Sequence, residues 1–167
     1  MANQILSPAR LREVLFYNPE SGLFHWICDT RRLPAGSLAG TKKAKYCQIR
    51  VDKSIYLAHR LAWLYIYGVW PEGEVDHING VTRDNRICNL RRCTRGENSQ
   101  NLSISTKNTS GFIGVSFCLR RCLWRSVITI KRKNISIGYF LSKEDASFAY
   151  LEAKRRLHNF QPTPRID

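Results

Sequence analysis

A polar, turn-rich segment divides the chain into two stretches with different patterns. It reads SISTKNTSG, at residues 103–111, and such a composition is typical of a linker. The chain has 167 residues, which is enough for one ordinary domain or two small ones, so each hydrophobic core would be modest. We therefore expect two compact modules, residues 1–105 and residues 106–167.

The net charge of the chain indicates a polyanionic partner. Lys and Arg number 27 against 13 Asp and Glu, a net charge of +14. The excess is present on both sides of Ser105, with 15 basic and 9 acidic residues up to it and 12 basic and 4 acidic residues after it. Solubility does not require so large an imbalance. A merely soluble basic protein is the alternative interpretation.

The sequence predicts a cytoplasmic protein that does not enter a membrane. No apolar run approaches the roughly 20 residues of a membrane span, and the start, MANQILSPARLREV, lacks the apolar core of a signal peptide. Disulfides are not expected in a reducing compartment. The pairs Cys88/Cys93 and Cys118/Cys122 only loosely resemble zinc-binding pairs, and a structural zinc site stays open as an alternative.

The first module begins with short helices and strands. Ser7 and Pro8 are typical of a helix start, and the helix is expected to run through ARLREVLFY. A turn, NPESG, separates it from a strand, LFHWIC. YCQIRV and SIYLA form a hairpin pattern, and HRLAWLYIYG follows as a helix that Gly68 ends. His59, at the start of that helix, is expected to be a cap or a packed core residue.

Residues 75–101, VDHINGVTRDNRICNLRRCTRGENSQN, predict a strand, a loop, a second strand and a helix. The first strand covers residues 74–77 and the second covers RICNLRRC. Thr94 is the expected N-cap of the helix, with Glu97 completing a capping box. The pairs Asn79-Gly80 and Asp84-Asn85 are turn chemistry, and the alternative is that all the asparagines of this segment are turn residues.

The second module predicts a three-stranded antiparallel sheet and one helix, so the expected fold class is α+β. FIGVSF, LWRSVITI and NISIGYF are the strand patterns, and the helix starts after Ser142. Strand alternation divides the middle strand into two faces. One face is expected to pack on the helix through Phe148 and Leu151, and the other is left for a partner. The first face carries Trp124, Ser126, Ile128 and Ile130, and the second carries Arg125, Val127, Thr129 and Lys131.

The segment around Asp76-His77 resembles the HNH endonuclease motif, the ββα-metal or His-Me finger, in the version found in phage and intron homing endonucleases. The resemblance covers residues 69–101 and depends on three pairs that occur together and in order. It implies a nuclease domain, and a host-cell cytoplasm if a phage encodes the chain. The three pairs are Asp76-His77, Asn89-Leu90 and Glu97-Asn98.

By this resemblance, His77 is the general base, Asn89 positions it, and Asp76 and Asn98 hold a metal ion. An imidazole can accept a proton from water at neutral pH. A carboxylate and an amide oxygen are hard ligands suited to Mg²⁺ or Mn²⁺. Many members of the superfamily have histidine at the position of Asn98, and the asparagine here favours magnesium over zinc.

The second module is similar to the plant ethylene-response-factor (Apetala-like) type of DNA-binding domain, through GV, W-R-x-x-I, IGYF and the helix EDASFAYLEA. The resemblance implies that the sheet lies in the major groove of DNA. Ser116 and Val127 replace charged base-contacting residues of the plant proteins, so the target sequence cannot be transferred. Across both modules, the residues expected to contact DNA are Lys42, Lys43, Lys45, Arg60, Arg120, Arg121, Arg125, Thr129, Lys131, Arg132 and Lys133.

The sequence as a whole predicts a metal-dependent, sequence-tolerant, site-specific DNA endonuclease of homing type. One metal and one base make one cleavage centre, so a monomer, or a weak dimer, is expected to nick one strand of double-stranded DNA at a time. The alternative is a non-catalytic DNA-binding regulator with a degenerate HNH fold. An RNA-binding protein is a weaker alternative, because few aromatic residues alternate with basic ones.

Overall fold

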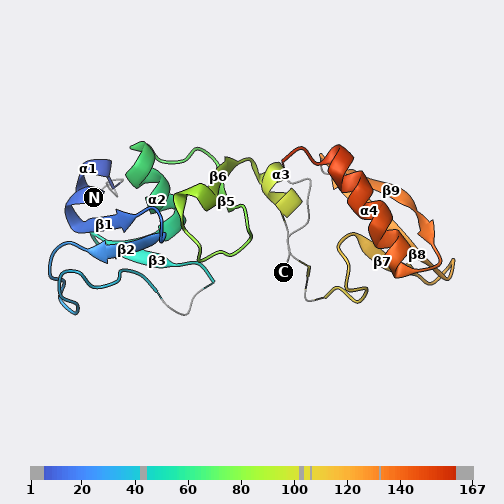
Figure 1. Ribbon diagram of the computed structural model, residues 1–167, viewed down its shortest axis with the longest axis horizontal. Helices are drawn as coiled ribbons and strands as arrows, with labels where there is room; N and C mark the ends of the chain where they lie inside the picture. Colours follow the sequence, from blue (N-terminus) through green and yellow to red (C-terminus); the bar gives the residue numbers. More distant parts are fainter. Residues whose placement is uncertain (1–5, 42–44, 102–103, 106, 132, 161–167) are drawn as a thin grey trace. The chain divides into compact units, whose positions relative to one another are not determined.

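A computed structural model gives the fold as two compact units, Met1–Cys93 and Thr94–Asp167 (Figure 1). Both combine short helices with small antiparallel sheets, which agrees with the expected mixture of α and β structure. The structure describes residues 6–41, 45–101, 104–105, 107–131 and 133–160.

The first unit starts with α1 (Pro8–Val14) and a hairpin of β1 (Leu15–Asn18) and β2 (Leu23–Trp26). The Ser7 side chain accepts a hydrogen bond from the backbone N of Arg10, 3.2 Å away, as expected of an N-cap. The prediction that this helix continues through residue 17 was wrong. The segment LFYN pairs with LFHW as a strand instead.

A second hairpin, β3 (Gln48–Val51) and β4 (Ser54–Leu57), leads directly into α2 (Ala58–Tyr67). The hairpin and the helix were both expected from the sequence. Gly68 ends the helix with φ 72°, a left-handed conformation that glycine adopts easily. Within this unit, α1 packs against α2 (Figure 1).

One hydrophobic core holds these elements together. The rings of Tyr17 and Phe24 lie 4.7 Å apart across the first hairpin, and both side chains are almost fully buried. Burial of apolar surface contributes about 25 cal/mol per Å². Val75, on the strand that carries Asp76 and His77, belongs to the same core as Leu61 and Leu64 of α2, so the core holds this strand in place. Its buried members include Leu11, Leu15, Ile49, Val51, Leu61, Leu64, Val75 and Leu90.

The HNH segment folds as β5 (Glu74–His77), a 3₁₀ turn η1 (Ile87–Asn89), and β6 (Leu90–Cys93), which pairs antiparallel with β5. The bounds of β5 are those expected. The second strand is shorter than expected, since Asn89 lies in the 3₁₀ turn and not in the strand.

The helix of the motif, α3 (Arg95–Asn98), continues into a 3₁₀ turn, η2 (Ser99–Asn101), and both belong to the second unit. The capping box of Thr94 and Glu97 is present as expected. The boundary between compact units therefore falls earlier in the chain than residue 105, and the assignment of functions to residues 1–105 and 106–167 stays a prediction.

The rest of the second unit is a three-stranded antiparallel sheet in the order β7-β8-β9 with α4 along one face (Figure 1). The register shifts between Ser126 and Val127, where β8 pairs irregularly with β9. Strand and helix types agree with expectation. The elements are β7 (Val115–Cys118), β8 (Leu123–Ile130), β9 (Lys133–Phe140) and α4 (Lys143–Leu157).

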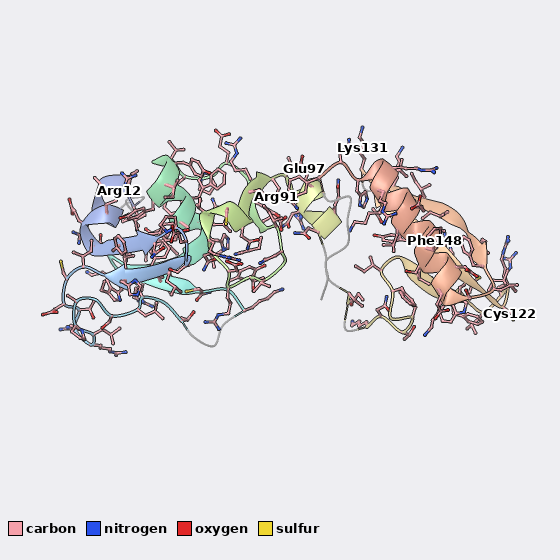
Figure 2. All side chains as sticks on the ribbon, viewed as in Figure 1. Arg12, Arg91, Glu97, Cys122, Lys131 and Phe148 are labelled. Carbon is pink, nitrogen blue, oxygen red and sulfur yellow. The ribbon has the colours of Figure 1, made fainter. Side chains whose placement is uncertain are left out.

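The buried face of α4 differs from the one expected. Phe148, labelled in Figure 2, is 67% exposed, so the prediction that it packs on the sheet was wrong. The buried side chains of the helix are instead Ala146, Tyr150 and Lys154, which recur every four residues and so share one face. A Cβ at Gly114 would overlap the Tyr150 ring, which shows how closely helix and sheet approach.

Lys154 also connects α4 to the segment that follows α3. It is 2% exposed, and its Nζ donates a hydrogen bond to the carbonyl oxygen of Gln100 at 3.1 Å. The backbone N of Phe160 donates to Oε1 of the same glutamine at 3.3 Å. These contacts explain why the motif helix groups with the C-terminal part of the chain. Among the described residues, no helix is long and apolar enough to cross a membrane.

Candidate active site

Asp76 and His77 lie at the end of β5 and are 3% and 4% exposed. β5 is buried because Val75 joins the core and β6 covers one edge of the strand. Neighbouring residues on a strand point to opposite faces. The carboxylate and the imidazole therefore have different surroundings.

The carboxylate of Asp76 pairs with a cation from the neighbouring strand. Arg91 lies directly opposite in the β5–β6 register, and its Nε and Nη2 are 3.1 and 2.9 Å from Oδ2 (Arg91 is labelled in Figure 2). Burying a carboxylate without a partner would be strongly unfavourable. Arg91 therefore gives the buried Asp76 side chain a partner of opposite charge inside the domain. This arginine was not predicted from the sequence, although residues directly opposite each other on paired strands commonly interact.

The imidazole of His77 contacts an asparagine that the sequence analysis assigned to turn structure. Nε2 of His77 lies 3.1 Å from Oδ1 of Asn85, and Asn85 is 4% exposed. The sequence gives no signal that separates this asparagine from the others of the loop. Its contact with His77 follows only from the folded position of the loop between β5 and β6.

Asn89, the residue expected to position His77, bonds with the loop itself. Its Nδ2 donates to Oδ1 of Asn79 at 2.9 Å and to the carbonyl oxygen of Asp84 at 2.8 Å. Its Oδ1 accepts from the backbone N of Asn79 at 3.0 Å. Asn89 thus closes the loop between β5 and β6, and a positioning effect on His77 through that loop stays a prediction.

His59 packs against His77 in the interior of the first unit. The two rings lie 5.0 Å apart and edge to face, and His59 is 6% exposed. Burial, followed by the nearby His77 and Arg60, lowers the pKa of His59 to about 3. Of the two expected roles, cap and packed core residue, the structure supports the second, because the side chain makes no capping hydrogen bond.

Asn98, the second expected metal ligand, is half-buried at the end of α3. It lies in the second unit, whereas Asp76 lies in the first. The sharing of one metal ion by these two residues remains a prediction. By donor chemistry they suit it, since a carboxylate and an amide oxygen fit Mg²⁺ or Mn²⁺.

The described side chains form no cluster of metal-binding groups. No group of three or more His, Cys, Asp or Glu among them could hold a metal ion, and the six cysteines are free thiols. A site with one carboxylate and one amide is not a cluster of that type. It would leave positions on the ion for water and phosphate oxygens.

The residues expected to contact DNA divide into three groups. Lys42, Lys43 and Arg132 lie outside the described residues. Arg60 donates hydrogen bonds to the carbonyl oxygens of Gly73 and Pro71, at 2.9 and 3.1 Å, and so stabilises the turn before β5. The remaining side chains are exposed or half-buried: Lys45, Arg120, Arg121, Arg125, Thr129, Lys131 and Lys133.

The face of the second unit's sheet that carries Arg125 also carries an aromatic residue not identified from the sequence. Ser116, Arg125 and Tyr139 are direct partners across β7, β8 and β9, so they share this face. The Arg121 guanidinium lies over the Tyr139 ring, 4.4 Å from its centroid, a cation–π geometry. The face therefore combines two cations with an aromatic ring.

Two comparisons with known proteins match parts of this chain. A model of the HNH endonuclease family matches residues 56–100, which contain α2, His59, Asp76, His77, Asn85, Asn89 and Asn98. Over 101 residues the chain is 36% identical to "Protein 3.8" of Escherichia phage T7, an alignment that covers 60% of this chain and 83% of that protein. No solved structure matches.

The match and the β5–β6–α3 order define an HNH endonuclease domain. The chain belongs to the same family as the phage T7 protein 3.8. The similarity of residues 106–167 to ethylene-response-factor domains stays a prediction.

Proposed function

We propose that this chain is a metal-dependent endonuclease of homing type that hydrolyses phosphodiester bonds in double-stranded DNA and nicks one strand per monomer. The observation that supports it is the Asp76-His77 pair at the end of β5, inside a segment that matches the HNH endonuclease family. Proximity of an acid ligand and a base is what hydrolysis of a phosphodiester requires.

In the proposed reaction, His77 accepts a proton from a water molecule as the water oxygen attacks phosphorus. The bond between phosphorus and the 3′ oxygen breaks, and a proton from solvent neutralises that oxygen. The products are a 5′ phosphate and a 3′ hydroxyl. A positioned general base of this kind contributes about 10²- to 10⁴-fold to the rate.

Asp76 and Asn98 would hold the metal ion. A bound Mg²⁺ or Mn²⁺ supplies positive charge that stabilises the negative charge developing on the phosphate. Within the chain, Arg91 pairs with Asp76, and the closed loop of Asn79, Asp84 and Asn89 holds the end of β5 in place.

The phosphate must reach an imidazole that is 4% exposed. Tyr46 is the half-buried residue whose ring lies near both histidines, 5.6 Å from His59 and 6.2 Å from His77. We therefore expect side chains around His77, Tyr46 among them, to move when DNA binds.

Delivery of DNA is assigned to the positively charged face of the second unit. Arginine side chains can read guanine bidentately, and lysines contact phosphates. Arg125, Arg121 and Tyr139 lie on one face of its sheet or over it. The turns beside the sheet add exposed cations at Arg120 and Lys131, and the first residue of β9 adds Lys133.

Nicking of supercoiled plasmid DNA tests the proposal. With Mg²⁺ or Mn²⁺ present we expect conversion to the open-circular form, with a chelator abolishing it and with linear DNA appearing only later. The alternative, a DNA-binding regulator that does not cut, predicts retarded plasmid that stays supercoiled with either ion. That outcome would replace the nuclease by the regulator.

A further inference from the structure

One face of the sheet in the second unit carries an exposed pair of polar side chains near the end of the β8–β9 hairpin. Thr129 on β8 and Asn134 on β9 are direct partners in the register, and both residues are exposed. On β8, Ser126 and Ile128 are 0% and 1% exposed, because they point to the opposite face, on which α4 packs (Figure 1). Thr129 and Asn134 therefore lie on the same face as Arg125.

A hydrogen bond within this pair sets the orientation of the Asn134 amide. The hydroxyl of Thr129 donates to Oδ1 of Asn134 at 2.7 Å, and among the described residues no other hydrogen bond holds this amide. An asparagine amide has two N–H donors and two acceptor lone pairs. The contact with Thr129 uses one lone pair. A second acceptor position on Oδ1 and both donors of Nδ2 therefore remain for a ligand.

The backbone beneath the pair is held on the side of the helix. Nε2 of His158, which is 5% exposed, lies 3.2 Å from the carbonyl oxygen of Thr129, and so connects β8 to the end of α4. On both sides of Asn134 the two strands continue to pair. A side chain that recognises a ligand is positioned more accurately by a strand of a sheet than by a loop. The amide is therefore presented from a fixed position.

The surface around the pair favours a negatively charged ligand. None of the strands β7, β8 and β9 contains Asp or Glu. Lys131 and Lys133 lie close to the pair along the chain and are exposed, and Arg125 lies on the same face. A nucleic acid duplex satisfies these charges. DNA is favoured over RNA, because side chains cannot read bases in the deep and narrow major groove of an RNA helix.

We propose that Asn134 determines sequence specificity by reading an adenine in the major groove of the target DNA, and that Thr129 fixes its amide for this contact. Adenine presents a donor at N6 and an acceptor at N7, which pair with the oxygen and the nitrogen of an asparagine amide. These are the groups that the bond with Thr129 leaves for a ligand. Guanine presents two acceptors instead. This inference rests on the proposed function, to which it adds one residue and one base.

The test selects duplex DNA from a random library with the full chain, in a chelator so that the DNA is not cut, and sequences the DNA that is retained. For native protein we expect one position at which adenine is preferred by about 5- to 150-fold in Kd. Asn134→Ala should lose the preference at this position alone. Asn134→Asp should prefer cytosine there, because a carboxylate accepts from the N4 amino group. Asn159→Ala, the same change at an exposed asparagine beyond α4, is the matched control and should leave every preference unchanged.

Modified bases at that position separate base reading from a purely structural role of the pair. 7-Deazaadenine lacks the N7 acceptor and should weaken binding by native protein by about 5-fold or more, with no effect on Asn134→Ala. Diaminopurine changes only the minor groove edge of adenine, and native protein should bind it like adenine. Thr129→Val, which removes the hydroxyl but keeps the shape, should lower the preference for adenine less than Asn134→Ala does.

The outcomes distinguish this inference from the proposed function. An adenine preference that survives in Asn134→Ala, or an equal effect of 7-deazaadenine on native protein and on this variant, would overturn the inference and leave the nuclease standing. A lower unfolding midpoint of Asn134→Ala with unchanged preferences would show that the pair only stabilises the hairpin, which also overturns it. Native protein that neither retains nor nicks DNA would contradict the proposed function itself.

Discussion

Arg91 and Asp76 form an ion pair across β5 and β6, with both Nε and Nη2 of the arginine directed at the same carboxylate oxygen. The aspartate is buried and the arginine side chain is 22% exposed. The pair explains how an acidic side chain can be kept inside the domain. It also means that a metal ion held by Asp76, as proposed, would share the carboxylate with Arg91.

The first prediction concerns this pair. Arg91→Ala should lower the free energy of unfolding by about 3 kcal/mol in the absence of metal, because it removes a charged partner from a buried carboxylate. Added Mg²⁺ should restore part of that loss if Asp76 is a ligand. Thermal unfolding with and without Mg²⁺ measures both effects.

Arg92 provides the control, because it is exposed and its ion pair with Glu72 has a 3.6 Å separation at the surface. Arg92→Ala should change stability by less than about 0.5 kcal/mol. An Arg91→Ala protein that Mg²⁺ stabilises no more than it stabilises native protein would argue against Asp76 as a metal ligand.

The second prediction is a loss of stability in acid caused by His59. Its pKa is about 3 in the folded protein, against an ordinary value of 6.5. Between these values the unfolded chain binds a proton at His59 and the folded protein does not, so the free energy of unfolding falls as pH decreases below about 6.5. The slope that His59 contributes approaches about 1.4 kcal/mol per pH unit.

Denaturant unfolding between pH 7 and pH 4.5 checks this, with His59→Gln as the comparison. The variant should be less stable at pH 7 but should lose less stability on acidification. His158, whose pKa burial also lowers, contributes a slope of the same sign in both proteins. Parallel pH curves for native protein and variant would show that His59 is not responsible.

The third prediction compares two glycines with similar backbone angles. Gly36 has φ +82° and a Cβ there would meet nothing within 4 Å, whereas a Cβ at Gly22 would overlap the backbone of Asn85 and Arg86. Gly36→Ala should cost about 1 kcal/mol of stability from backbone strain.

Gly22→Ala should cost clearly more than Gly36→Ala, because the hairpin must also move away from the loop that carries Asn85. It should lower nicking activity as well, and Gly36→Ala should not. Unfolding and plasmid assays on both variants measure this. Equal losses of stability and activity would show that the hairpin does not support the loop.

The fourth prediction concerns DNA binding by the second unit. Arg125→Ala should weaken binding of the native target by about 1–3 kcal/mol and relax its preference at one base pair. Arg155→Ala is the control, since this exposed arginine lies on α4 and pairs with Glu152. Binding titrations at several salt concentrations compare them. A larger effect of Arg155→Ala would move the DNA interface from the sheet to the helix.

The elements that could be predicted from sequence are those whose signal is local. Thr94 and Glu97 form a capping box within four residues, and Gly68 marks the end of an apolar helical pattern. β5 is bounded by turn residues on both sides. Each of these features depends on neighbours along the chain.

The predictions were wrong where contacts with segments distant in the sequence determine the structure. LFY, residues 15–17, was assigned to a helix, but pairing of LFYN with LFHW makes the segment a strand. Phe148 and Tyr150 both fit an amphipathic pattern, and only the docked sheet selects Tyr150.

At the site, Asp76, His77 and Asn89 were predicted from the sequence as functional residues, and their roles stay predictions, but their contacts were not predicted. Residues 75–101 contain five asparagines. Their turn-forming tendency does not predict which of them contacts the imidazole. Asn85 does so because Tyr17 and Gly22, from the first hairpin, fix its backbone. Contacts between residues so far apart in sequence leave no local pattern.

The central claim is that His77 is the base of a DNA nuclease, and one comparison tests it most directly. His77→Ala and His25→Ala, a half-buried histidine on β2, are assayed side by side for nicking of supercoiled plasmid in Mg²⁺ and for DNA binding. The account predicts that His77→Ala loses nicking by about 10²-fold or more while it still binds DNA, and that His25→Ala cuts like native protein. Nicking by His77→Ala at the native rate would contradict it.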